Sequence, residues 1–478
     1  MLLASGAYRG PELSHPLSAF QSLHPKSALA TGTVNVLAIM VQFQQDNDSL
    51  SSGNGQFVMT NGTGLDAPPH NKTFFENHLL FLKNYFHKVS GGKLNINYEV
   101  LDSVITLPHQ MKYYSPPESS STTADNLGLL YEDSWHAADS IYNGFDFSKF
   151  QCFVIFHAGS GRDIDFTSTF GFDPWPYNIP SIYLGMESLR LMLGANYDGQ
   201  AVDNGSFHIP NSIIMPETEL FETYDASGQL QDSLLLGTNG LLAANFGSFL
   251  GLPDLFDTKT GVTGIGQFGL MDGQSIFAYG GIFPPEPSAW EKMYLGWVNP
   301  VEVSPSAATT FQLYANETGK YSVLKVPING SEYFLLENRE RDALDNGEHI
   351  TTFYDGRYDT TSITYATDTT YFDGLQVKGI NGVVTDADEF DWALPSPGDP
   401  VDDAKYHGGI LIWHIDQNVI EQNLATNTVN ADPSHRGVAV MEAHGANMIG
   451  FLIQDITGSY YYSGTAYDFW FKGNPVPS

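Results

Sequence analysis

The most informative run of this chain is Gly240-Leu241-Leu242-Ala243-Ala244-Asn245-Phe246-Gly247-Ser248-Phe249-Leu250-Gly251-Leu252-Pro253-Asp254-Leu255-Phe256-Asp257. It predicts a helix on which Ala244 and Ser248 lie four residues apart and therefore on one face. Gly251 allows the helix to end and the chain to turn, so that Asp254 comes back toward that face. A helix-borne zinc site has this spacing: two imidazoles in His-Glu-x-x-His, then a third ligand beyond a glycine turn.

The residues that would perform zinc chemistry are absent from this frame. Ala244 and Ser248 occupy the two imidazole positions, and Asn245 occupies the position of the general base. Alanine has no donor atom, a neutral serine is a poor zinc ligand, and a neutral asparagine cannot accept a proton. We therefore expect no zinc and no catalytic residue here, with Asp254 as a hydrogen-bonded turn residue.

The segments around and after this run resemble the M6 peptidase family, the immune inhibitor A-like secreted metalloproteases. The matching segments are Phe246-Gly247, Leu250-Gly251-Leu252-Pro253-Asp254-Leu255-Phe256-Asp257, Gly264-Ile265-Gly266-Gln267-Phe268-Gly269-Leu270-Met271 and Pro287-Ser288-Ala289-Trp290-Glu291-Lys292-Met293-Tyr294-Leu295-Gly296-Trp297. The family signature reads roughly H-E-F-G-H-x-L-G-L-P-D-L-Y-D and continues to a G-I-G-x-W-x-L-M Met-turn. The resemblance covers roughly residues 33–470 and implies a metzincin-like fold, with Met271 in the Met-turn beneath the site. It also implies secretion, and the three replacements imply that the family's activity is lost.

Composition limits the possible partners. The chain has 478 residues, 42% of them hydrophobic, which is enough for more than one core because single cores stop growing near ~250–300 residues. Its 54 acidic and 21 basic residues give a net charge of −33, which disfavours nucleic acid and anionic membranes. No apolar run approaches the ~18 residues that span a bilayer, so we expect no membrane insertion. The first residues do not resemble a signal peptide, and because the resembled family is secreted, we expect a mature chain whose leader has been removed.

The pattern along the chain predicts three parts. We expect an extended arm over 1–30, an α/β metzincin-like domain with a mixed sheet and helices over 31–300, and a β-rich, sandwich-like domain over 301–478. The expected strands of the α/β part are 33–43, 94–101, 151–156 and 209–219, and the expected helices are 73–89, 124–142 and about 232–250. The single cysteine, Cys152, lies in an apolar strand and is expected in the core.

Two other groups of residues offer metal ligands. Asp163 and Asp165 follow a His157-Ala158-Gly159 turn and are candidate calcium ligands, although an ordinary acidic turn has the same composition. The C-terminal region holds His407, His414, Asp416, His435, Glu442 and His444. The pair His414 and Asp416 and the pair Glu442 and His444 each share a strand face, and their convergence would make a metal site. Hydrogen-bonded structural histidines are the more ordinary interpretation. Asp416 and Asp468 are further candidate calcium ligands.

The leading hypothesis is a secreted, catalytically inactive M6-type peptidase homologue that acts by binding a protein or peptide, or by self-assembly outside the cell. No zinc is expected in it, and calcium is a candidate ion. One alternative is an active endopeptidase with a relocated site that uses Asp254. Another is a surface-layer or filament subunit that reuses the fold. A glycine spacing typical of dinucleotide sites at 264–269 is better explained by the Met-turn.

Overall fold

The structure is a computed structural model, and it describes residues 28–116, 124–164, 166–225, 227–304, 309–368, 379–397, 400–455 and 458–475. Most of the expected arm over 1–30 lies outside the described residues, as does Asp165. Residues Ala28–Ala30 form a short 3-10 helix, η2.

A mixed sheet forms the N-terminal half, with strands in the order β2-β1-β3-β7-β4 and β8 paired to the far half of β7. Its strands are β1 (Gly32–Gln42), β2 (Leu94–Thr106), β3 (Cys152–Ser160), β4 (Ile182–Leu184), β7 (Ser212–Tyr224) and β8 (Leu230–Leu236). The neighbours β2, β1, β3 and β7 are parallel, whereas the edge strand β4 and β8 run antiparallel to β7. A largely parallel sheet must be covered on both faces, which explains the nearly unbroken apolar run of β1.

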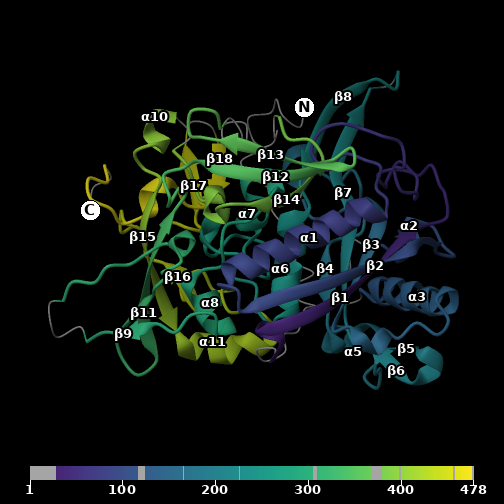
Figure 1. Cartoon of the computed structure of the whole chain (residues 1–478), viewed down its shortest axis with the longest axis horizontal. Coiled ribbons are helices and arrows are strands. Elements are labelled where there is room, and N and C mark those ends of the chain that lie inside the picture. The colour runs from purple at the N-terminus through teal and green to yellow at the C-terminus, as the bar shows by residue number, and fades with distance from the viewer. Residues whose placement is uncertain are drawn as a thin grey trace.

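Helices supply that cover, and alternate residues of β1 face two separate cores. Val36, Ala38 and Met40 enter the core of α1 (Lys72–Val89) and α6 (Asn239–Phe249). The intervening residues of β1 enter the core of α2 (Met111–Tyr114), α3 (Asp125–Ile141) and α5 (Met186–Leu193), the last two on the right of Figure 1. The side chain of Asn71 caps α1 by accepting a bond from the Phe74 amide.

The C-terminal half is built mainly from strands, as expected. One sheet has the order β16-β15-β11-β10-β9 and a second has the order β13-β12-β14. Their strands are β9 (Val301–Glu302), β10 (Leu324–Pro327), β11 (Glu332–Glu340), β12 (Glu348–Tyr354), β13 (Arg357–Ile363), β14 (Val383–Ala387), β15 (Gly408–Asp416) and β16 (Val438–Val440). The remaining elements include β5 (Gln200–Val202), β6 (Phe207–Ile209), β17 (Leu452–Asp455), β18 (Gly458–Tyr461), α4 (Thr167–Phe170), α7 (Gly273–Ile276), α8 (Ala289–Leu295), α10 (Pro400–Asp403) and α11 (Gln417–Asn423). The chain is therefore a mixed α/β protein with several sheets.

Contacts across the two halves are extensive. The ring of Tyr85 on α1 lies 4.7 Å from that of Phe390, and Asn84 donates to the carbonyl of Thr385 on β14. Buried Arg339 on β11 binds the Asp391 carboxylate and the carbonyls of two N-terminal-half residues, Phe268 and Glu286. These contacts fix the segment that carries Met271, although a domain boundary near residue 300 stays a prediction.

Most strands and helices predicted for the first half are confirmed to within a few residues, but two predictions are wrong. The helix expected from about Asp232 begins only at Asn239, because the residues before it form β8 and pair with β7. The expected His157-Ala158-Gly159 turn lies inside β3, where all three residues are buried. Cys152 is buried, as predicted. Among the described helices, none is both long and apolar enough to cross a membrane.

Candidate functional site

Helix α6 is buried along its whole length. The three residues that occupy the expected zinc-ligand and general-base positions are also buried. Ala244 is 5% exposed, Asn245 7% and Ser248 4%. The Asn245 amide donates to the carbonyl of Leu241 at 2.9 Å, and the Ser248 hydroxyl donates to the carbonyl of Ala244 at 3.3 Å. Both polar side chains therefore satisfy backbone groups of their own helix and present no metal-binding pair.

The turn after α6 has the geometry that the sequence predicts. Gly251 has φ +94°, in the left-handed region, and its amide donates to the carbonyl of Ser248 at 2.9 Å. The chain then brings Asp254 against Asn427. The Asp254 amide donates to Asn427 Oδ1 at 2.9 Å, and Asn427 Nδ2 donates to Asp254 Oδ2 at 2.6 Å. This confirms Asp254 as a hydrogen-bonded turn residue.

Burial changes the chemistry of that carboxyl group. Asp254 is only 8% exposed, and desolvation raises its pKa to about 7, while the Asn427 bond lowers it and Asp272 raises it further. A single carboxyl group with an amide partner cannot hold a catalytic zinc ion, which normally takes three protein ligands and a water molecule.

Met271 packs directly beneath α6, which agrees with its expected place under the site. A Cβ on Gly247 would lie 2.8 Å from the Met271 sulfur, so a side chain there would require the Met271 side chain to shift. The Met271 turn is held by buried Glu291, which accepts from the amides of Met271 at 2.9 Å and Leu270 at 3.2 Å. Burial raises the pKa of Glu291, and its bonds to Ser288 and to these amides oppose that rise.

The role of Glu291 was not predicted from the sequence, but a signal for it exists. Ser288 and Glu291 form a capping box at the start of α8, in which the serine side chain and the glutamate each bind the other's backbone amide. The Ser-x-x-Glu spacing alone identifies such a box. It does not reveal that the same carboxylate also supports residues twenty positions earlier.

A buried network of histidines and carboxylates, also missed from the sequence, surrounds the start of α6. His70 Nδ1 lies 2.6 Å from Glu217 Oε2, and His78 Nδ1 lies 2.8 Å from Asn239 Oδ1. Asp66 accepts from the amide of Thr238, just before the helix. Burial raises the pKa of Asp66 and lowers that of His78. These four ionisable side chains are between 1% and 4% exposed, so the network stabilises the fold and is closed to a substrate.

The candidate calcium ligand Asp163 is buried beside Glu219. Asp163 accepts bonds from the amide and the hydroxyl of Ser181, each at 2.9 Å. Burial raises the pKa of Asp163 to about 6 and raises that of Glu219 well above its ordinary value. Two such carboxyl groups hold a shared proton readily, and Ser181 already satisfies one of them without a cation. Calcium binding with Asp165, which lies outside the described residues, stays a prediction.

The pair His414 and Asp416 does not converge with the pair Glu442 and His444 among the described residues, so the metal site considered as an alternative does not form from these four. His414 Nε2 lies 3.1 Å from Glu332 on the neighbouring strand β11. Asp416 caps helix α11, and its other oxygen lies 3.0 Å from His435. Each of these residues therefore has a hydrogen-bond partner close by. His414 pairs with a residue of the adjacent strand, and Asp416 pairs with His435 and with the amides at the start of α11.

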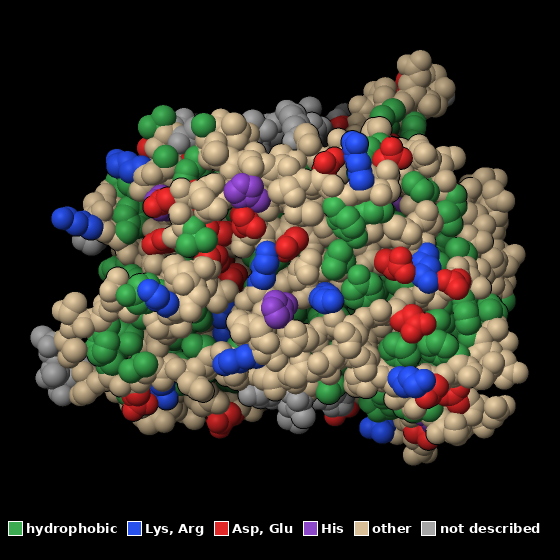
Figure 2. Space-filling model, viewed as in Figure 1, with side chains coloured by type: hydrophobic (Ala, Val, Ile, Leu, Met, Phe, Trp, Pro, Cys, Tyr) green, Lys and Arg blue, Asp and Glu red, His purple; other side chains and the backbone are tan. Residues whose placement is uncertain are grey.

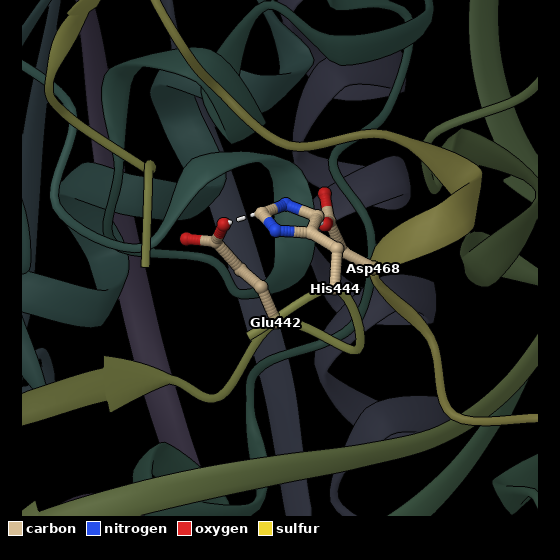
Figure 3. A group of neighbouring side chains, drawn as sticks. All are labelled: Glu442, His444 and Asp468. Carbon is tan, nitrogen blue, oxygen red and sulfur yellow. Dashed lines mark ion pairs between the residues drawn. The ribbon is translucent and has the colours of Figure 1, made fainter. Parts of the chain in front are cut away.

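Glu442, His444 and Asp468 do converge, and they are the one group of three potential metal ligands found among the described residues (Figure 3). His444 Nε2 lies 2.9 Å from Glu442 Oε2 and 3.0 Å from Asp468 Oδ1. The sequence identified the first two as a pair and Asp468 as a separate calcium candidate. It did not show that they meet, because Asp468 arrives from a later segment of the chain.

Comparison of the chain with protein-family models and with curated proteins gives no match. The resemblance to the M6 family rests on the motifs quoted above and stays a prediction.

Proposed function

We propose that this chain is a secreted, catalytically inactive homologue of the M6 zinc peptidases, with a metzincin-like α/β region and a β-rich, sandwich-like region, that acts by binding. The proposal rests mainly on which residues occupy three positions of α6 and on what their side chains contact. Ala244 has no ligand atom, and Asn245 and Ser248 bond to carbonyls of their own helix. The mixed sheet, the Gly251 turn and Met271 beneath α6 support the metzincin-like part of the proposal.

Peptide hydrolysis by this class of site requires a metal-bound water and a base to deprotonate it. Asn245 cannot serve as that base, and Asp254 is paired to Asn427 through two hydrogen bonds. An active endopeptidase that uses Asp254 would need at least two further ligands beside it. In the described part of the chain, the group able to hold a metal consists of Glu442, His444 and Asp468, and it does not include Asp254.

A protein or peptide partner, or another copy of the chain, is the proposed ligand class. Figure 2 shows acidic and basic side chains interspersed with hydrophobic ones on one face of the molecule. The net charge of −33 favours a cationic partner over an anionic one, since like charges raise the free energy of encounter. Extracellular location is part of the proposal and rests on the resemblance to a secreted family.

The deciding experiment is a hydrolysis assay on an unstructured protein such as casein, with and without a chelator, and with an active zinc endopeptidase as the positive control. We expect no chelator-sensitive cleavage by the purified chain. Cleavage that stops when the metal is removed would contradict the proposal and favour a relocated active site. Sedimentation velocity over a range of protein concentrations tests the self-assembly form, because a subunit of a filament or surface layer sediments faster as concentration rises.

A further inference from the structure

We propose that Glu442, His444 and Asp468 form a binding site for one divalent transition-metal ion, with Zn²⁺ as the best match. The site lies far from α6 along the chain and is independent of the proposed peptidase ancestry. Glu442 and His444 follow strand β16, and Asp468 ends the short helix η10 (Ala466–Asp468). A bound ion would therefore join two segments of the C-terminal region.

The positions of the ligand atoms match the edges of a coordination shell. Ligand atoms about 2.0–2.2 Å from a zinc ion at tetrahedral or octahedral angles lie roughly 3.0–3.5 Å from one another. His444 Nε2 is 2.9 Å from Glu442 Oε2 and 3.0 Å from Asp468 Oδ1, and the three ligand atoms all lie within 4.8 Å of one another. Figure 3 shows the imidazole ring between the two carboxylates. Small shifts would admit an ion among them.

Asp468 provides a second, independent observation. Its side chain has no exposed surface, and its Oδ1 atom has no hydrogen-bond partner in the structure. Its other oxygen, Oδ2, accepts from the Tyr462 hydroxyl at 2.8 Å and the Thr465 amide at 2.7 Å. These bonds fix the carboxylate so that the unsatisfied oxygen points at His444. His444 Nε2 lies 3.0 Å from this oxygen but outside hydrogen-bond geometry, so the buried oxygen is poorly satisfied, and a cation would remove that cost.

Glu442 is fixed in the same manner from the other side. Its two oxygens accept from the amides of Ile449 and Met448, each at 2.8 Å. Partners of this kind orient metal ligands before the ion arrives and raise affinity. The two carboxylates repel each other at this separation, and the His444 ring lies between them, while the Arg436 guanidinium also interacts electrostatically with Glu442.

The hydrogen bond made by the His444 ring indicates which of its two nitrogens carries the proton. The Ala446 amide donates to His444 Nδ1 at 3.1 Å, so the ring proton of the neutral form sits on Nε2 and faces the two carboxylates. A metal ion would replace that proton, Nδ1 would take it up, and the Ala446 amide would turn to solvent. Ala446 is exposed and lies between Gly445 and Asn447, whose φ values of +75° and +50° mark a tight surface turn. The rearrangement is therefore local.

The donor set indicates the class of metal. One imidazole nitrogen with two carboxylate oxygens suits zinc and its first-row neighbours, whereas calcium takes 6–8 oxygen ligands. The His444 side chain is 16% exposed, which leaves an approach for the ion and room for a water ligand. After Asp468 the chain pairs with β15 through Trp470 and Ile410. The ion would thus fasten the C-terminal segment to the β15–β16 sheet.

The test uses the full chain after treatment with a chelator and isothermal titration with zinc chloride. Asp468→Asn is the main variant, because an asparagine keeps one oxygen for Tyr462 and Thr465 and replaces only the oxygen that faces His444. His444→Ala is the second variant. His435→Ala is the matched control, since it removes a histidine that lies 3.0 Å from a single carboxylate, Asp416.

We expect one zinc ion to bind the wild type and His435→Ala with equal affinity, and at least about tenfold weaker binding in Asp468→Asn and His444→Ala. Zinc should raise the melting temperature of the wild type and not that of Asp468→Asn, each compared with the same protein in chelator. Absence of zinc binding to the wild type, binding unchanged in both variants, or binding of calcium alone would overturn the assignment. Zinc that survives Asp468→Asn but is lost in Asp254→Asn would place the metal near α6 and contradict the inactive-site proposal as well.

Discussion

Replacing Asp254 with asparagine tests whether the turn after α6 is a structural remnant or a metal ligand. The change keeps an oxygen to accept from Asn427 Nδ2 and leaves the Asp254 backbone bond to Asn427 intact. It removes only the negative charge, which burial disfavours. We therefore expect Asp254→Asn to be more stable than the wild type at neutral and alkaline pH.

The magnitude follows from the linkage between protonation and folding. Burial raises the pKa of Asp254 from 3.8 to about 7, so the folded state binds more protons than the unfolded state between these values. The stabilisation by the protonated carboxyl group is fully present below pH 3.8 and is lost as the pH rises through about 7. A pKa difference of about three units corresponds to roughly 4 kcal/mol as an upper bound. Asp254→Asn should gain up to that amount relative to wild type between acidic and alkaline pH.

Urea unfolding of both proteins across this pH range, with chelator present, measures the difference while the contributions of all other groups cancel. Identical pH profiles for wild type and variant would refute the burial argument. Repeating the series with zinc separates the two interpretations of the site. If Asp254 bound zinc, the variant would be less stable than wild type only when the metal is present, and the inactive-site proposal would fall.

The remaining predictions concern the contacts that hold the α6 region in place. Asp391→Ala removes the closer carboxylate of the buried Arg339 guanidinium and leaves it only the Glu337 carboxylate at 3.5 Å as an ion-pair partner among the described residues, so we expect a loss of about 3 kcal/mol in unfolding free energy. Asp359→Ala, at an ion pair in which Arg357 is 73% exposed, should cost less than about 1 kcal/mol by the same denaturant titration; equal losses would contradict the buried-network argument. Glu291→Gln places an amide group where Leu270 and Met271 donate, and it should cost about 1–3 kcal/mol, measured in the same way. An unchanged midpoint would show that the Met271 turn does not depend on Glu291.

The spacing of hydrophobic residues predicted most helices and strands of the first half, because that spacing reflects which side chains of an element are buried. Helix α1 and strand β1 present apolar residues at helical and strand spacing toward identifiable cores, and both were found close to their expected bounds. The error at the start of α6 has a physical origin. Leu234, Leu235 and Leu236 are compatible with either a helix or a strand, and pairing of β8 with β7 decided the outcome. The local sequence pattern does not show that β7 will pair with this segment.

The side-chain constellations were harder to predict because their members are distant in sequence. Asp254 pairs with Asn427, 173 residues later, and Glu442 meets Asp468 only because the C-terminal segment returns past β16. Sequence spacing groups the histidines His414 and His435 with Glu442 as candidate metal ligands. In the structure His414 instead pairs with Glu332 on the adjacent strand, and His435 pairs with Asp416. Spacing predicts which residues share a face, and the topology determines which faces meet.

The retained and the replaced residues of the α6 run differ in what they contact, and this bears on how the motif should be interpreted. Gly247 lies where a side chain would require Met271 to shift, Gly251 takes φ +94°, and the Phe246 ring packs 4.8 Å from that of Phe86. The fold requires these residues whether or not a metal is bound. Ser248, by contrast, bonds to a carbonyl within α6, whereas Asn245 bonds to a carbonyl of α6 and also donates to the Met215 sulfur on β7 at 3.9 Å. Packing therefore accounts for Gly247, Gly251 and Phe246 without a metal, so the frame of a zinc site does not by itself indicate activity.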